Sequence, residues 1–274
     1  MAAMMNIVVK LGGDVVASPA MDAIARDVRE LVEEWHRVAI VHGGGPQASA
    51  LQKTLGQEPR IISGKRFTDE ATLEVMKFVV AGQVNVDCCA RLLAGGVMPV
   101  GLHGASGHVI QARRRPPRAL TGAGPEPVDL GLVGDVIGFN LGLLGDLWER
   151  RYVPVLACLG MSAEGQALNI NGDTVASQLA GALRADALVL VTSTPGVLRQ
   201  VSDPASRVPR MTRTEFERGV ADGSISGGMI PKLEESFRVL AGGARSVVIV
   251  GKLGAGDLRR AVLEPGSVGT VLVA

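Results

Sequence analysis

The chain has few aromatic residues, few cysteines and almost no net charge. Only 3% of its 274 residues are Phe, Trp or Tyr, so its core must consist mainly of Val, Leu, Ile and Ala. Lys and Arg number 28 against 27 Asp and Glu, a net charge of +1. This balance argues against nucleic acid or an anionic membrane as the main partner. The three cysteines, Cys88, Cys89 and Cys158, have no metal-ligand spacing, and free thiols suit a reducing cytosol.

Long apolar runs and several common motifs are also missing. No apolar run reaches the ~18 residues of a membrane span, and no charged-then-apolar leader opens the chain, so a cytoplasmic protein is expected. The sequence contains neither G-x-x-x-x-G-K-[ST] nor G-x-G-x-x-G, which excludes a P-loop and a dinucleotide fingerprint. His42, His103 and His108 stand apart from any nucleophile constellation.

Glycine is abundant, with 36 residues, and it occurs between predicted strands and helices. Val38–Val41 is an apolar, β-branched run that predicts a buried strand. Gly43, Gly44 and Gly45 follow it, and a helical spacing begins at Ala48. A turn of this kind presents free N–H groups at the positive end of a helix and can bind a carboxylate or phosphate. A tight turn without any ligand remains the alternative.

Two lysines and one acid occupy comparable places. Lys10 lies near the end of a buried strand predicted over Asn6–Leu11, which Gly12 and Gly13 follow, and a cation within such a strand favours an anionic ligand. The alternative is an edge-strand lysine that reaches water. Lys232 lies in the first turn of a helix predicted over 227–240, where the helix dipole disfavours a cation unless an anion is near. Asp173 enters another predicted helix beside Asn169 and Asn171, a cluster that simple capping would also explain.

Strand and helix patterns alternate over most of the chain and predict a mainly parallel sheet covered by helices. Thr68 is expected to cap a long helix whose apolar positions run from Leu73 to Leu92. Residues 103–140 predict antiparallel hairpins, and Met161–Gln166 predicts a polar turn between two lobes.

The lysines, the acid and the glycine turns suit phosphoryl transfer, which requires positioning and neutralisation of charge. If the acceptor is already an ionised carboxylate, no general base is needed. This explains why a chain without a histidine or cysteine constellation could be a kinase.

Five motifs resemble the acetylglutamate kinases of the amino acid kinase family. They are VVKLGG at 8–13, VHGGGPQ at 41–47, GKRFTD at 64–69, NINGDTVA at 169–176 and ISGGMIPK at 225–232. The resemblance spans nearly the whole chain in order. It implies a three-layer α/β/α sandwich with two lobes sharing one central sheet, residues 1–160 for the amino acid and dimer contacts and 161–274 for ATP.

The resemblance also implies a reaction and its residues. Members of this family phosphorylate the side-chain carboxylate of N-acetyl-L-glutamate with ATP, in arginine biosynthesis, and Mg²⁺ is held mainly by the nucleotide phosphates rather than by a protein site. By motif, the catalytic residues are Lys10, Asp173 and Lys232, and the substrate-binding residues are Gly44, Gly45, Arg66 and Asn169. The ATP-binding residues are Gly12, Gly13, Thr192, Gly196, Gly227, Gly228 and Met229.

Departures from the family pattern keep two alternatives open. Ser193 stands where the family usually has Asp, and His103–Gly107 differs from the usual glycine-rich segment. The alternatives are a carrier-protein-linked aminoadipate or glutamate kinase of lysine biosynthesis, and a non-catalytic regulatory homologue. Only five residues precede the first predicted strand, too few for the N-terminal helix of arginine-inhibited hexamers. A homodimer insensitive to arginine is therefore expected.

Overall fold

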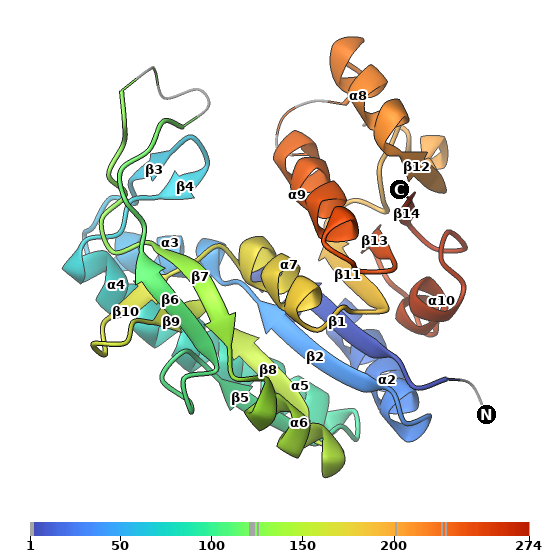
Figure 1. The fold of residues 1–274 in the computed structure, drawn as a ribbon, viewed down its shortest axis with the longest axis horizontal. Coiled ribbons are helices and arrows are strands. Elements are labelled where there is room, and N and C mark those ends of the chain that lie inside the picture. Colours follow the sequence, from blue (N-terminus) through green and yellow to red (C-terminus); the bar gives the residue numbers. More distant parts are fainter. Residues whose placement is uncertain are drawn as a thin grey trace.

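The computed structural model describes residues 3–120, 124, 126–200, 202–225, 227 and 229–273. An eight-stranded sheet in the order β12-β14-β13-β11-β1-β2-β8-β5 runs through the molecule (Figure 1). The strands, in chain order, are β1 (Asn6–Leu11), β2 (Arg37–His42), β5 (Pro99–Leu102), β8 (Val153–Ala157), β11 (Ala187–Thr192), β12 (Arg210–Thr212), β13 (Val247–Gly251) and β14 (Thr270–Val273).

The sheet is mainly parallel, as predicted. Only the β13–β14 pair is antiparallel among its neighbouring strands. The central strands are buried along almost their whole length, because helices cover both faces of the sheet (Figure 1). This burial explains why the strands read as continuous apolar runs instead of alternating patterns.

The helices form two groups. Helix α2 (Ala20–Glu33) contacts α5 (Asn85–Ala94) and α10 (Asp257–Leu263), whereas α7 (Gly172–Ala182) contacts α9 (Met229–Ala241) and strand β1. The remaining helical segments are α1 (Gly13–Val16), α3 (Gly45–Thr54), α4 (Glu70–Met76), η1 (Lys77–Val84), α6 (Leu141–Glu149), η2 (Pro204–Ser206) and α8 (Arg213–Ala221). No helix in the part of the chain that the structure describes has both the length and the apolar character to cross a lipid bilayer.

A second, four-stranded sheet contains the predicted antiparallel hairpin. Its order is β10-β9-β6-β7, with β6 (Ile110–Arg114), β7 (Gly134–Phe139), β9 (Leu159–Met161) and β10 (Ala167–Asn169). Strand β6 pairs antiparallel with β7. The polar turn predicted at 161–166 joins β9 to β10 and so lies within this sheet. A further hairpin, β3 (Ile61–Ile62) and β4 (Lys65–Arg66), lies above it in Figure 1.

The predicted long helix is present, but its middle is not α-helical. Residues 77–84 form the π-helix η1 between α4 and α5. Its buried residues continue into α5 at intervals of four, through Val80, Val84, Cys88 and Leu92. An α-helix repeats every 3.6 residues, so an exact interval of four drifts around it. The wider π turn, an uncommon form often found at functional sites, spans the interval from Val80 to Val84, and the later intervals lie in α5.

Thr68 does not cap this helix, so that prediction is wrong. Asp69 is the N-cap, and its carboxylate accepts a hydrogen bond from the Thr72 N–H at 2.8 Å. The buried Thr68 hydroxyl instead donates to the Arg66 carbonyl and accepts from Asn169. Both Thr68 and Asp69 could cap the helix, but the hydroxyl of Thr68 is already hydrogen-bonded to Arg66 and Asn169.

Asp27 connects the beginning and the end of the fold. It is buried in α2, and its carboxylate accepts backbone N–H bonds from Gly256, Leu258 and Arg259 at the start of α10. Burial raises the pKa of Asp27, while the three N–H bonds act in the opposite direction. The carboxylate therefore provides the acceptor for free N–H groups at the start of α10, which lies more than 200 residues away in the sequence.

We expect Asp27→Ala to lower the free energy of unfolding by about 2–4 kcal/mol, because it leaves several buried N–H groups without an acceptor. Urea unfolding at neutral pH measures the change. Asp22→Ala is the control, since Asp22 forms only an exposed ion pair with Arg91, worth about 0–1 kcal/mol. Equal effects of the two substitutions would contradict the capping role.

Candidate active site

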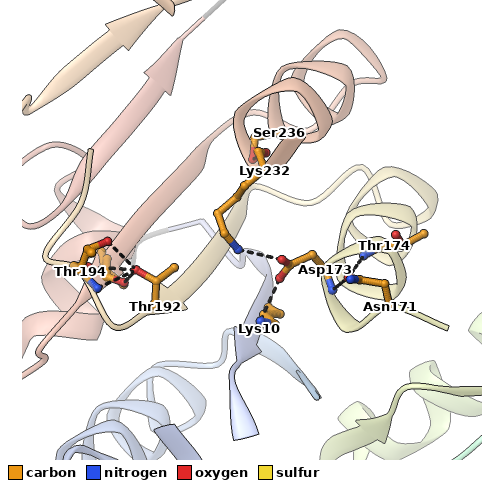
Figure 2. A network of polar contacts seen from close by, with 9 residues as sticks. Lys10, Asn171, Asp173, Thr174, Thr192, Thr194, Lys232 and Ser236 are labelled. Carbon is orange, nitrogen blue, oxygen red and sulfur yellow. Dashed lines mark hydrogen bonds and ion pairs between the residues drawn. The ribbon is translucent and has the colours of Figure 1, made fainter. Parts of the chain in front are cut away.

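Three charged side chains from distant parts of the chain meet at one end of the central sheet. Lys10 Nζ lies 2.9 Å from Asp173 Oδ1, and Lys232 Nζ lies 2.7 Å from Asp173 Oδ2. Lys10 belongs to β1, Asp173 to the first turn of α7 and Lys232 to the start of α9. Figure 2 shows both ammonium groups directed at the same carboxylate. The sequence predicted this grouping, and its geometry is that of one acid bridging two cations.

The electrostatics of this group leave one positive charge in excess. Burial raises the pKa of Asp173, but the ammonium groups of Lys10 and Lys232 outweigh burial and hold this pKa below its usual value. Asp173 is therefore ionised at neutral pH. The side chains of Lys10, Asp173 and Lys232 remain 14%, 25% and 17% exposed. An anion that approaches from solvent can thus reach the two ammonium groups.

The first glycine turn lies directly after Lys10. Gly12 is the N-cap of α1, and Gly13 is its first residue. The Gln47 amide donates to the Gly13 carbonyl at 2.6 Å. A Cβ on Gly13 would lie 2.3 Å from Gln47 Oε1 and 3.0 Å from Gly44 Cα. The backbone of this turn therefore packs closely against the second glycine turn, with no space for a side chain.

The second glycine turn follows β2. Gly44 is the N-cap of α3 and Gly45 is its first residue, so the first N–H groups of the helix have no acceptor within it. A Cβ on Gly44 would lie 3.1 Å from Val80 and 3.3 Å from Val84, both in the π-helix η1. The N–H end of α3 is thus held between the first glycine turn and η1.

Arg66 and Asn169, two predicted substrate-binding residues, lie near this second turn. The Arg66 guanidinium donates to the Gly45 carbonyl at 2.9 Å, to Ser49 Oγ at 2.7 Å and to Gln52 Oε1. Asn169, buried in β10, donates to Thr68 Oγ1 at 3.0 Å. Arg66 is therefore oriented by α3, and Asn169 is connected to the segment that carries Arg66.

Ser49, Gln52 and Thr68 also belong to this network, although the sequence motifs assign no binding role to them. Gln52 lies within the helical spacing that begins at Ala48. It is 2% exposed, and a buried amide needs hydrogen-bond partners. A polar residue among the apolar residues of a helix face could have indicated that Gln52 has a buried partner. The sequence does not show that this partner is Arg66, because Arg66 lies on a different element.

The predicted ATP-binding residues fall into three groups. Gly12 and Gly13 lie beside Lys10. Thr192 ends β11, where its hydroxyl donates to the Thr194 carbonyl at 2.9 Å and lies 3.2 Å from the Val250 carbonyl oxygen. Figure 2 draws it with Thr194, and β11 pairs with β1, the strand that carries Lys10. Gly196, with φ +148°, would place a Cβ 2.8 Å from Thr270 Oγ1.

The third group lies at the start of α9, near Lys232. Gly227 has φ +60° and Met229 begins the helix, whereas Gly228 lies outside the described residues. Ser193, at the departure from the family pattern, is exposed. Within the described ranges, no group of three or more His, Cys, Asp or Glu side chains could hold a metal ion.

We expect the stabilisation from Asp173 to depend on pH in one direction. A carboxylate with a lowered pKa contributes fully above the pKa of the unfolded chain, about 3.9, and its contribution falls as the pH drops through the folded-state pKa. The difference in unfolding free energy between wild type and Asp173→Asn should thus be constant from about pH 8 to 5.5 and shrink near pH 4. Urea unfolding at each pH measures it, and a difference that grows on acidification would contradict this assignment.

Comparisons with known proteins identify the family of this chain. The model of the amino acid kinase family matches residues 5–251. An acetylglutamate kinase of Anaeromyxobacter sp. (strain K) is 79% identical over 270 residues, covering 98% of this chain and 99% of that protein.

Two solved structures share the fold. The Streptococcus mutans UA159 protein smu.665 is 27% identical, with a TM-score of 0.78 and 98% coverage of both chains. A carbamate kinase from Giardia lamblia, bound to AMP-PNP, is 17% identical, with a TM-score of 0.64 and coverage of 100% of this chain and 99% of that chain. The resemblance seen in the sequence motifs is confirmed, and the chain belongs to the amino acid kinase family.

Proposed function

We propose that this protein transfers the γ-phosphoryl group of ATP to the side-chain carboxylate of N-acetyl-L-glutamate, in arginine biosynthesis. The observation that carries the proposal is the pairing of Lys10 and Lys232 with one carboxylate beside two glycine turns. The relative with 79% identity, named acetylglutamate kinase, supports the choice of acceptor.

The chemistry follows from the charges. A carboxylate oxygen of the substrate attacks the γ-phosphorus, the bond from this phosphorus to the bridging oxygen breaks, and ADP leaves with that oxygen. The acceptor is already ionised, since a glutamate side chain has a pKa of about 4.3, so no base is required. Lys10 and Lys232 neutralise the charge of the transferring group. Asp173 is a positioning residue that holds both ammonium groups.

The two substrates are assigned to opposite sides of this group. The N–H groups of Gly44 and Gly45, with Arg66 and Asn169, bind the amino acid in an N-terminal lobe, residues 1–160. Residues 161–274 form the ATP lobe, where Thr192, Gly196, Gly227, Gly228 and Met229 contact the nucleotide. Gly12 and Gly13 complete the phosphate-binding turn between the two substrates.

Mg²⁺ accompanies the nucleotide in this proposal. Both oxygens of Asp173 already contact lysines, so this carboxylate is a poor candidate for a metal ligand. The phosphate oxygens of ATP therefore hold the ion, which supplies further charge neutralisation. The free thiols Cys88, Cys89 and Cys158 support a cytoplasmic location.

A coupled assay of ADP release tests the function. We expect activity with N-acetylglutamate, and little with glutamate or with aminoadipate derivatives, whether free or carrier-linked. Lys10→Ala or Lys232→Ala should each lower kcat by about 10²–10³-fold, because each removes a charge aimed at the transition state. Lys53→Ala, an exposed change on α3, is the control. Preference for the aminoadipate derivative would favour the lysine pathway, and inactivity of the wild type on every acceptor would favour a regulatory homologue.

Arg66 is assigned to binding and not to the chemical step. Since its guanidinium grips the α-carboxylate in ground and transition states alike, we expect Arg66→Lys to raise KM for the amino acid about tenfold and to change kcat less than about threefold. Arg213→Lys, within an exposed ion pair of α8, should change neither constant. A loss of kcat at constant KM would place Arg66 at the reacting atoms.

The proposed assembly is a homodimer that pairs through the outer face of η1 and α5. Phe78, Val86, Leu93 and Met98 are 54–66% exposed there. Val86 and Leu93 are two turns apart and share a face of α5, and Met98 precedes β5, an edge strand of the central sheet. A surface of this kind is typical of an interface between subunits.

We expect Leu93→Glu to convert the dimer into monomers, because a buried charge without a partner is costly at an interface. Sedimentation velocity measures the change. Leu55→Glu is a matched control, since Leu55 and Leu93 are 56% and 57% exposed. Dissociation by the control alone, or a wild type that sediments as a monomer, would contradict the proposed interface.

A further inference from the structure

Two buried polar side chains behind the second glycine turn are not explained by the proposed reaction. His42, the last residue of β2, is 0% exposed, and Asn85, the first residue of α5, is 7% exposed. They form a hydrogen-bonded chain that begins at the backbone of β8 and ends at the backbone of Gly43. Buried polar groups without a structural or functional reason are uncommon, so these hydrogen bonds are expected to have a role.

The hydrogen bonds of Asn85 determine which histidine nitrogen carries the proton. Asn85 Nδ2 lies 3.1 Å from the Val155 carbonyl oxygen and 2.8 Å from His42 Nε2. The carbonyl only accepts, so the atom facing it is the amide nitrogen, which only donates. His42 Nε2 must therefore accept. Burial lowers the pKa of His42, so the ring is neutral, and its single proton is on Nδ1.

The Nδ1 proton has one acceptor. His42 Nδ1 lies 2.9 Å from the carbonyl oxygen of Gly43 and donates to it. Across a trans peptide, this carbonyl and the N–H of Gly44 point in opposite directions. A proton on His42 Nδ1 thus turns the Gly43 oxygen toward the buried ring and directs the Gly44 N–H away from it.

The surroundings restrict the chain to this arrangement. Gly101 leaves space for Asn85, because a Cβ there would lie 2.1 Å from Asn85 Oδ1. The same Oδ1 faces the thiol of Cys89 at 3.9 Å. Gly44 itself is packed against Val80 and Val84 of η1, directly before Asn85. The π-helix therefore packs against Gly44 on one side, and it also determines where the amide of Asn85 lies relative to His42.

We propose that His42 and Asn85 are positioning residues, which set the direction of the Gly43–Gly44 peptide and thereby aim the Gly44 N–H at the amino-acid substrate. This inference rests on the proposed function, because that function gives the Gly44 N–H its ligand. It adds that the strength of substrate binding depends on a histidine tautomer, chosen by an asparagine on a different helix.

Asn85→Asp tests the tautomer with little change in volume. A carboxylate opposite Nε2 draws the ring proton to that nitrogen, so Nδ1 would then present a lone pair to the Gly43 oxygen and repel it. At about pH 8.5, above the usual histidine pKa, we expect KM for N-acetylglutamate to rise about tenfold or more, with KM for ATP within about twofold of wild type. In ¹⁵N NMR of the full protein, the proton of His42 should move from Nδ1 to Nε2.

Asn85→Ala separates positioning from packing. It leaves a cavity but does not draw the His42 proton from Nδ1 to Nε2. The positioning role therefore predicts a smaller rise in KM for alanine than for aspartate. A packing role predicts the reverse order, because aspartate preserves the shape. Asn140→Asp is a matched control, since it too replaces an amide that donates to a backbone carbonyl, that of Gly107, while it keeps the side-chain oxygen that caps α6.

The outcomes separate this inference from the proposed function. An unchanged KM in Asn85→Asp with a moved proton, or a larger effect of alanine, overturns the positioning role. A loss of kcat alone, with both KM values unchanged, shows a structural effect on the active fraction and also overturns it. A wild type that is inactive on N-acetylglutamate overturns the proposed function, whereas the NMR measurement still reports whether Asn85 sets the tautomer.

Discussion

The contact of two lysines with one partly buried carboxylate is the interaction on which the arrangement of the site depends. Lys10 comes from β1, near the centre of the sheet, and Asp173 and Lys232 come from the first turns of α7 and α9. Two ammonium groups this close would repel each other without the carboxylate between them. Helix α7 packs against β1, β11 and α9, and this packing brings Asp173 and Lys232 to Lys10. The sheet thus assembles a positive site from residues more than 200 positions apart.

Beside this charged group lie two backbone turns whose close approach depends on glycine. The two turns at 12–13 and 43–45 approach so closely that a Cβ on Gly13 would lie 3.0 Å from Gly44 Cα. Gln47 connects them by donating to the Gly13 carbonyl. Since each turn leads into a helix, N–H groups from both gather beside Lys10. Neutral peptide groups of this kind bind anions without adding flexible charged side chains that would have to be ordered.

The sequence was informative wherever the signal was local. Buried β-branched runs predicted the central strands, and the charged residues before and after glycines predicted Lys10, Asp173 and Lys232 as one group. Signals that depend on tertiary contacts were missed or misjudged. Thr68 and Asp69 are equally good caps in sequence, and only the contact with Asn169 separates them. The π-helix was missed because intervals of four residues fit an α-helix over short stretches, and its wider turn is held by packing against Gly44.

The segment from η1 to α5 shows why such contacts matter to function. One side of it exposes Phe78 and Val86, while the other side packs Val80 and Val84 against Gly44 and carries Asn85 to His42. A continuous α-helix would rotate Asn85 relative to Val80, because each residue then turns by about 100°. The contacts of Val80 with Gly44 and of Asn85 with His42 would then no longer be made together. With the wider π turn, both faces keep their partners. The uncommon helix is thus the element that joins the outer surface, the hydrogen bonds of His42 and the second glycine turn.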